Sequence, residues 1–155
     1  MGTVPAIQFT QEQARTIAEV SSQSLRHWRK LVPYLAGKSG KAARFTYADV
    51  IGLIATTQIV GNLGVSVGSM PMGIESLFRV LATTRLLDLQ HSVILVGVDK
   101  TEICRANELS KFNPTAPTLV IPCDPLLEKM RGFILPDSAI DPQMNLPFPP
   151  QAVQG

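Results

Sequence analysis

The sequence has few of the features that mark membrane-spanning or disulfide-linked proteins. It contains only two cysteines among 155 residues, too few for the disulfide framework of a small secreted domain. No apolar run reaches the roughly 18 residues that a transmembrane helix needs, and the first residues carry no secretory signal pattern. Hydrophobic residues make up 45% of the chain, enough for a core. We therefore expect a folded, cytoplasmic protein with reduced thiols and no membrane partner.

Sequence signals of catalysis and of metal binding are also missing. Four glycines lie between residues 61 and 73, but no Gly-Lys-Ser/Thr ending and no preceding strand make them a phosphate-binding loop. No nucleophile-elbow sequence frames a serine. Cys104 and Cys123 are separated by 18 residues without a nearby histidine, whereas zinc ligands usually occur in close pairs. We expect no enzyme, no catalytic residue, no metal and no cofactor, and two buried, unreactive thiols.

Acidic residues are absent from one segment that is rich in basic residues. Between Glu19 and Asp49 the sequence has no Asp or Glu. Six basic residues fall in the same segment: Arg26, Arg29, Lys30, Lys38, Lys41 and Arg44. Such a local excess of positive charge favours a polyanionic partner. The charge pattern alone fits a solvated surface stretch equally well.

A first short helix is predicted to begin at Thr10. Thr10 and Gln13 have the spacing of a capping box, in which each side chain bonds a free backbone N–H at the helix start. Ala14 and Ile17 then lie on one face at helical spacing. The helix is expected to end near residues 20–21.

A second helix is predicted immediately after the first. Ser21 or Ser22 can cap it, Leu25 and Trp28 are expected to face the core, and Pro33 is expected to end it. Two short helices joined by a tight turn, the second with a basic outer side, are typical of a helix-turn-helix. The second helix of that motif enters the major groove of DNA.

The segment that follows predicts a wing and a third helix. Residues 36–45 contain two glycines and three basic residues, which suits a flexible hairpin, or wing, against a phosphate backbone. Phe45 is expected to join the core beneath it. Thr46 and Asp49 have capping-box spacing, and the carboxylate favours a helix N-terminus. This third helix is expected to end near residues 61–64.

The second half of the chain is predicted to combine helices with short strands. Residues 74–89 are expected to form an amphipathic helix. Its apolar stripe comprises Leu77, Phe78, Leu81, Leu86 and Leu89. Short strands are expected at 92–98, 102–106 and 118–121, followed by a helix at 126–133.

The predicted fold class is mainly α with a small α+β C-terminal part: a winged helix-turn-helix, then an amphipathic helix and two or three short strands. We divide the chain into three parts. Residues 1–72 form the winged helix-turn-helix, residues 73–135 form a dimerisation or effector segment, and residues 136–155 form a Pro-rich, flexible tail.

Five short segments of the first half also form an ordered pattern. They are Phe9-Thr10, Val20-Ser21, Leu25-Arg26-His27-Trp28-Arg29, Arg44-Phe45-Thr46-Tyr47-Ala48-Asp49-Val50 and Gly64-Val65-Ser66-Val67. In order and spacing they resemble the DNA-binding domain of the MerR family of bacterial transcription regulators. The resemblance covers about residues 7–72 and implies a winged helix-turn-helix that binds DNA. Ala42-Ala43 replace the tyrosine–arginine pair of the family's wing, and no long coiled coil is evident after residue 75.

The candidate DNA-binding residues lie on the second helix and the wing. They are Ser22, Gln23, Arg26, His27, Arg29, Lys30, Lys38, Lys41 and Arg44. Gln23 is suited to adenine edges and Arg26 to guanine, each worth about 1–3 kcal/mol of discrimination. The other basic residues are suited to phosphates, which position a protein without reading sequence.

Two of these assignments have structural alternatives. Arg26 can pair with an acid such as Glu19 or Asp49 instead of DNA, and His27 can contact phosphate or simply pack. Trp28 shares a face with Leu25 and is predicted to be a core residue rather than a stacking platform.

The sequence therefore predicts a sequence-specific transcription regulator that binds double-stranded DNA as a homodimer, with an unidentified effector at its C-terminal part. Two alternatives remain open. One is an excisionase-like accessory protein that bends DNA. The other is a protein-interaction module without DNA binding, in which the apolar stripe at 77–89 and the strand at 93–98 form a binding edge.

Overall fold

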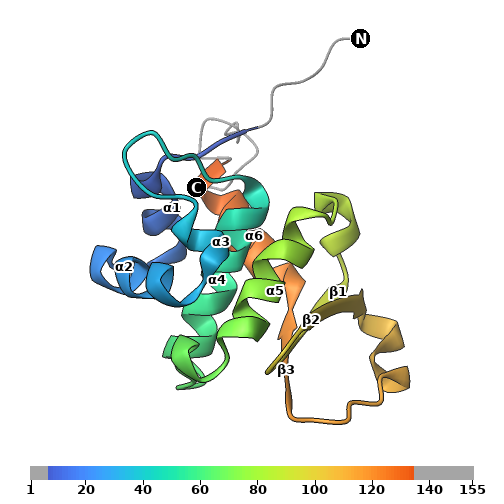
Figure 1. The fold of residues 1–155 in the computed structure, drawn as a ribbon. Helices are drawn as coiled ribbons and strands as arrows, with labels where there is room; N and C mark the ends of the chain where they lie inside the picture. Colours follow the sequence, from blue (N-terminus) through green and yellow to red (C-terminus); the bar gives the residue numbers. More distant parts are fainter. Residues whose placement is uncertain (1–6, 135–155) are drawn as a thin grey trace, which may run out of the picture.

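The computed structural model describes residues 7–134, so the predicted tail at 136–155 lies outside the described residues. The elements in chain order are α1 (Gln11–Ala18), α2 (Ser22–Leu31), α3 (Pro33–Ala36), α4 (Tyr47–Gly61), η1 (Val67–Ser69), α5 (Pro71–Ala82), η2 (Leu86–Leu89), β1 (Ser92–Gly97), β2 (Thr101–Arg105), η3 (Ala106–Lys111), β3 (Thr118–Pro122) and α6 (Cys123–Ile134). Figure 1 shows helices on one side and a small sheet on the other. The predicted mixture of helices with a small β part is confirmed. No helix within this described range is long and apolar enough to cross a membrane.

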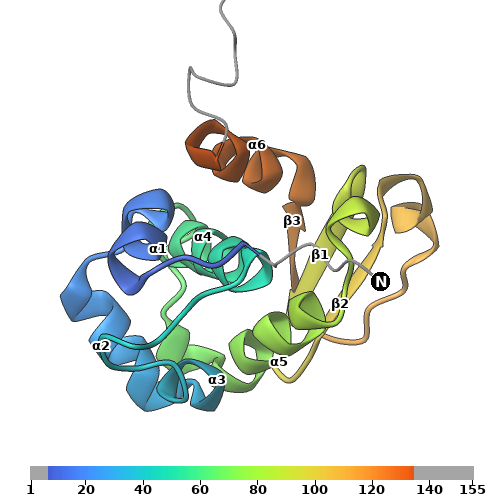
Figure 2. The ribbon, with the colours of Figure 1, turned by 90° about the horizontal axis from the view of Figure 1, so that it is seen from above.

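Helix α4 is the centre of the helical part. Its residues 50–56 are buried on every side of the helix, as expected for a helix that packs against neighbours all round. It contacts α1, α5 and α6, and Figure 2 shows it between α1 and α5. The N-terminal helices and the C-terminal helix are therefore held on the same support.

The sheet is antiparallel in the order β2-β1-β3. Ile94 of the central strand pairs with Ile103 of β2 and Ile121 of β3. Both α5 and α6 contact β1. A single cluster of buried hydrophobic residues runs from Phe9 to Met130, so the sheet and the N-terminal helices share one core.

Most predicted elements are confirmed, but the helix predicted at 74–89 is wrong at its C-terminal end. Helix α5 ends at Ala82, where the hydroxyls of Thr83 and Thr84 both donate to the carbonyl of Val80. These local bonds compete with further helical bonds. The chain then forms the separate turn η2, which leaves Leu86 38% exposed.

The segment predicted to be a wing contains no hairpin. We call residues 37–46 the basic loop. Its only strand-like pairing within residues 7–134 is a bridge between Phe9 and Phe45, whose backbone N–H groups each donate to the other's carbonyl at 2.8 Å. Phe45 is fully buried, as predicted. The two predicted short helices and the turn between them are present, whereas the predicted winged helix-turn-helix is not confirmed.

Helix α5 and the β1–β2 turn meet at a point where there is no room for a side chain. The backbone N–H of Gly73 donates to the carbonyl of Val98 at 2.9 Å, and the Thr101 hydroxyl donates to the carbonyl of Gly73 at 2.9 Å. A Cβ on Gly73 would lie 1.9 Å from the carbonyl oxygen of Gly97. This contact fixes the sheet to the helical part.

We expect Gly73→Ala to lower the free energy of unfolding by about 1–3 kcal/mol or more, because a backbone carbonyl cannot rotate away from the new methyl group. The matched control is Gly61→Ala, whose Cβ would meet nothing within 4 Å and which should be neutral or stabilising by up to about 1 kcal/mol. Urea unfolding followed by circular dichroism measures both. Equal stability of the two variants would contradict the described contact.

Candidate nucleic-acid interface

Local caps fix the start of α1 and the short turn that joins α1 to α2. Thr10 and Gln13 form the predicted capping box at the start of α1, with bonds of 2.9 and 3.1 Å. Glu19 ends the helix in the left-handed region, with φ of 58°, and Ser21 accepts the backbone N–H of Ser24 at 3.0 Å to cap α2. The left-handed conformation favours glycine, so Glu19 has the least favourable backbone conformation in this turn.

Helix α2 separates an apolar face from a polar one. Leu25 and Trp28 are 0% and 5% exposed, which confirms both as core residues. The predicted DNA-facing residues Ser22, Gln23, Arg26, His27 and Lys30 are all exposed. No acidic residue lies in this helix, so its outer face is polar in the first turn and basic from Arg26 onward.

The acids that were alternative partners for Arg26 are engaged elsewhere. Glu19 pairs with Lys129 of α6, and Asp49 pairs with Lys38 at 2.9 Å. Within residues 7–134 Arg26 forms no ion pair, so its guanidinium remains available on the surface.

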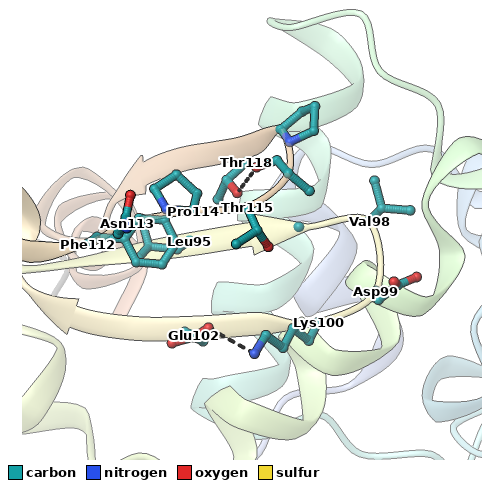
Figure 3. A pocket seen from close by; sticks show the side chains of 13 residues that line it. Leu95, Val98, Asp99, Lys100, Glu102, Phe112, Asn113, Pro114, Thr115 and Thr118 are labelled. Atoms are coloured by element: carbon teal, nitrogen blue, oxygen red, sulfur yellow. Dashed lines mark hydrogen bonds and ion pairs between the residues drawn. The ribbon is translucent and has the colours of Figure 1, made fainter.

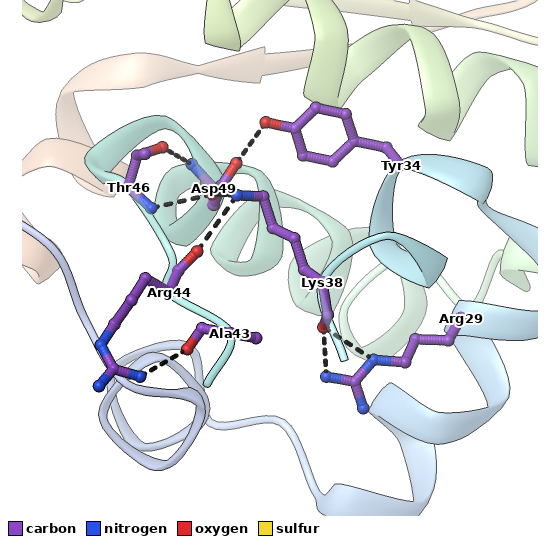
Figure 4. A network of polar contacts seen from close by, with 7 residues as sticks. All are labelled: Arg29, Tyr34, Lys38, Ala43, Arg44, Thr46 and Asp49. Atoms are coloured by element: carbon purple, nitrogen blue, oxygen red, sulfur yellow. Dashed lines mark hydrogen bonds and ion pairs between the residues drawn. The ribbon is translucent and has the colours of Figure 1, made fainter. Parts of the chain in front are cut away.

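Asp49 is the centre of a buried polar network (Figure 4). Its side chain is fully buried. One carboxylate oxygen accepts the Tyr34 hydroxyl at 2.6 Å, and the other accepts the Thr46 N–H at 2.9 Å and the Lys38 ammonium at 2.9 Å. Burial and then the Asp49 carboxylate raise the pKa of Tyr34, which stays protonated as a donor. Three donors thus compensate the buried charge.

Lys38 and Arg29, both predicted to contact phosphate, are occupied within the protein. The Lys38 ammonium also donates to the carbonyl of Arg44 at 3.1 Å. Arg29 donates through Nε and Nη2 to the carbonyl of Lys38, at 3.2 and 2.7 Å, and also bonds Gln11. Burial lowers the pKa of Arg29. These two basic side chains connect α2, α1 and the basic loop.

The remaining basic residues of the loop, Lys41 and Arg44, are exposed. Gly40 has φ of 86° at the tip, and the backbone N–H of Ala43 donates to its carbonyl at 3.2 Å. Lys41 is exposed beside this turn. Arg44 is also exposed, and its guanidinium donates to the carbonyls of Lys41 and Ala43 at 3.2 and 3.0 Å.

The fold brings α2 and the basic loop together. Ser22, Arg26 and Arg29 lie along one stripe of α2 at helical spacing, and the bonds from Arg29 to Lys38 attach the end of this stripe to the loop. A hollow of about 350 Å³ lies beside them, between the start of α1 and the loop, with Arg29 and Lys41 in its lining. Glu12 also lines it and is paired with Arg15.

Sequence reasoning missed the role of Tyr34. The sequence predicts Pro33 only as the end of α2, whereas Pro33 is also the first residue of the short helix α3, a position that proline favours. Helix α3 directs Tyr34 to Asp49 and stacks its ring on Phe78, with the ring centroids 5.4 Å apart. The Val-Pro-Tyr sequence could have indicated helix α3, but it gives no sign that Tyr34 bonds Asp49.

The two cysteines differ in exposure. Cys123 is buried, and burial followed by the nearby Asp124 raises its pKa to about 12. The prediction of two buried thiols is wrong for Cys104, which is only half-buried on β2, with burial raising its pKa as well. No cluster of three metal-ligating side chains occurs in the part of the chain that the structure describes.

Two further hollows are lined mainly by residues of the C-terminal half. One of about 420 Å³ lies between β1 and the 112–118 loop, with Leu95, Phe112 and the ion pair of Lys100 and Glu102 in its lining (Figure 3). The other, of about 380 Å³, is mainly apolar and includes Leu87, which is 73% exposed. Neither hollow includes a predicted DNA-binding residue.

Comparisons of this chain with protein-family models, with curated proteins and with solved structures find no match.

We expect Tyr34→Phe to lower the free energy of unfolding by about 1.5–3 kcal/mol, because the buried Asp49 carboxylate loses one of its donors. Tyr47→Phe is the matched control, since the Tyr47 hydroxyl has no hydrogen bond within residues 7–134 while its ring packs edge-on against Phe9. The control should change stability by less than about 0.5 kcal/mol. Thermal and urea unfolding measure both, and two equal values would argue against the network.

Proposed function

We propose that this chain is a sequence-specific DNA-binding transcription regulator that places α2 in the major groove and the basic loop on the phosphate backbone. The observation that carries the proposal is the exposed face of α2, which has basic and amide side chains, no acid and a basic loop attached at its end. An exposed helix of this kind, supported by a preceding helix and a tight turn, fits the major groove.

The distribution of ion pairs supports a polyanionic partner. The acids nearest to this surface are each paired within the protein: Glu12 with Arg15, Glu19 with Lys129, and Asp49 with Lys38. Within residues 7–134, no ion pair is formed by Arg26, Lys30, Lys41 or Arg44. An uncompensated basic surface attracts phosphates and releases their counterions.

The proposed roles follow from side-chain chemistry. Gln23 and Arg26, on the first turns of α2, read base edges, because an amide matches adenine and a guanidinium matches guanine. Lys30, Lys41 and Arg44 contact phosphates and set the orientation of the protein on the duplex. Ser22 and His27 flank the reading residues and add polar contacts at the groove edge.

A homodimer completes the proposal. One small module makes limited contact with DNA, and two copies on half-sites about 10 base pairs apart double the contacts. The apolar hollow with exposed Leu86 and Leu87 supports a contact between copies. The hollow beside Phe112 is the candidate position for an effector. The order of sequence signals supports a MerR-type relationship for residues 7–72.

A protein-interaction module without DNA binding is the second candidate. It is favoured by the exposed Leu86 and Leu87 of η2, because exposed apolar patches often mark protein contacts. The binding edge predicted at 93–98 is wrong, because β1 is the central strand and pairs with both β2 and β3. The predicted stripe is buried in the core at Leu77, Phe78 and Leu81. The two candidates differ in salt dependence. A phosphate-binding surface must lose affinity steeply as salt rises, whereas an apolar contact does not.

We expect Arg26→Ala to weaken binding to a duplex selected from a random pool by about 1–3 kcal/mol, or roughly 5- to 150-fold, with an unchanged melting temperature. Lys111→Ala removes an exposed base of η3, on the opposite side of the molecule from α2 (Figure 1), and should change affinity less than about twofold. Fluorescence anisotropy measures both. Unchanged affinity of Arg26→Ala would remove α2 from the reading role.

A further inference from the structure

We propose that Arg29 is a positioning residue for DNA binding, which acts by holding the basic loop in place and not by contacting a phosphate itself. The inference rests on the proposed function and assigns the mechanism by which the loop presents its charges. It also divides the six basic residues between Glu19 and Asp49 into those that bind and those that position.

The geometry of Arg29 carries the inference. Its Nε and Nη2 both donate to one acceptor, the carbonyl of Lys38, at 3.2 and 2.7 Å, and Nη2 also bonds the side chain of Gln11. A planar guanidinium that donates two hydrogen bonds to one carbonyl fixes both the orientation and the position of that peptide. The side chain is half-buried between α2, α1 and the loop, so the protein already surrounds much of it.

Arg29 bonds the backbone of Lys38, and the Lys38 side chain in turn links the two ends of the basic loop. The Lys38 ammonium donates to the carbonyl of Arg44 at 3.1 Å and pairs with the buried Asp49 at 2.9 Å. Lys38 is thereby fixed at its backbone by α2 and at its side chain by α4. The Lys38 side chain thus links residues 38 and 44 across the base of the loop, and the bridge between Phe9 and Phe45 secures the next residue.

The side chains that this arrangement leaves outside are Lys41 and Arg44. Both are exposed, and the turn at Gly40 lies between the fixed base and Lys41. A loop that is ordered before binding loses less conformational entropy when it meets DNA. Loss of Arg29 would therefore weaken binding by loosening Lys41 and Arg44, without removing a phosphate contact.

A double-mutant cycle on the full chain distinguishes positioning from direct contact. Arg29→Gln is measured alone and in combination with the pair Lys41→Ala and Arg44→Ala, by fluorescence anisotropy on one duplex at one salt concentration. We expect Arg29→Gln alone to weaken binding about fivefold to tenfold, and by less than about twofold once Lys41 and Arg44 are replaced, because residues that act together are not additive. The same fold-loss in both backgrounds would overturn the proposal.

Arg29→Lys is the conservative variant that separates charge from geometry. It keeps the positive charge but cannot donate two hydrogen bonds from a planar group to the Lys38 carbonyl. We therefore expect this variant to bind DNA as weakly as Arg29→Gln. Recovery of wild-type affinity by Arg29→Lys would assign Arg29 to a phosphate and contradict positioning.

Hydrogen exchange of the free protein supplies a readout that needs no DNA. We expect Arg29→Gln to speed amide exchange in residues 38–44 while leaving α4 protected. If exchange in the loop is unchanged, the proposal fails whatever the affinities are. If instead the wild-type chain shows no salt-dependent DNA affinity while loop exchange responds as expected, the proposed function fails, and Arg29 holds a loop that serves another partner.

Discussion

Burying the carboxylate of Asp49 requires the chain to bring three donors to one point in the core. A charged group shielded from water is tolerated only when it is paired and hydrogen-bonded. The hydroxyl of Tyr34, the N–H of Thr46 and the ammonium of Lys38 meet this requirement. They come from α3, from the end of the basic loop and from its beginning. The Asp49 carboxylate therefore constrains the path of the chain at both ends of the basic loop.

This constraint sorts the basic residues into two groups. Lys38 must turn inward to Asp49, and its carbonyl then becomes the acceptor for Arg29. These two charges stabilise the arrangement of α2, α4 and the loop. Arg26, Lys30, Lys41 and Arg44 are left outside on an exposed surface. We propose that the exposed side chains contact DNA, and that their positions depend on Arg29 and Lys38, which do not contact it.

The local part of this arrangement was predictable, and the tertiary part was not. The capping pairs of Thr10 with Gln13 and Thr46 with Asp49 can be recognised from their three-residue spacing, and they correctly mark where α1 and α4 begin. The contact of Tyr34 with Asp49 joins residues whose proximity depends on the fold, and no spacing rule reports it. The absence of a hairpin in the basic loop has the same origin, because bonds to Arg29 and Asp49 replace strand pairing.

DNA binding by α2 and the basic loop is tested by selection of source-genome DNA fragments with the purified full chain at about 0.15 M salt, where purely non-specific binding is weak. If the protein binds DNA as a dimer, as we propose, a short inverted repeat is enriched, with half-sites about 10 base pairs or a multiple apart, and affinity falls steeply with added salt. No enriched sequence, together with affinity that is absent or independent of salt, would contradict the proposed DNA binding.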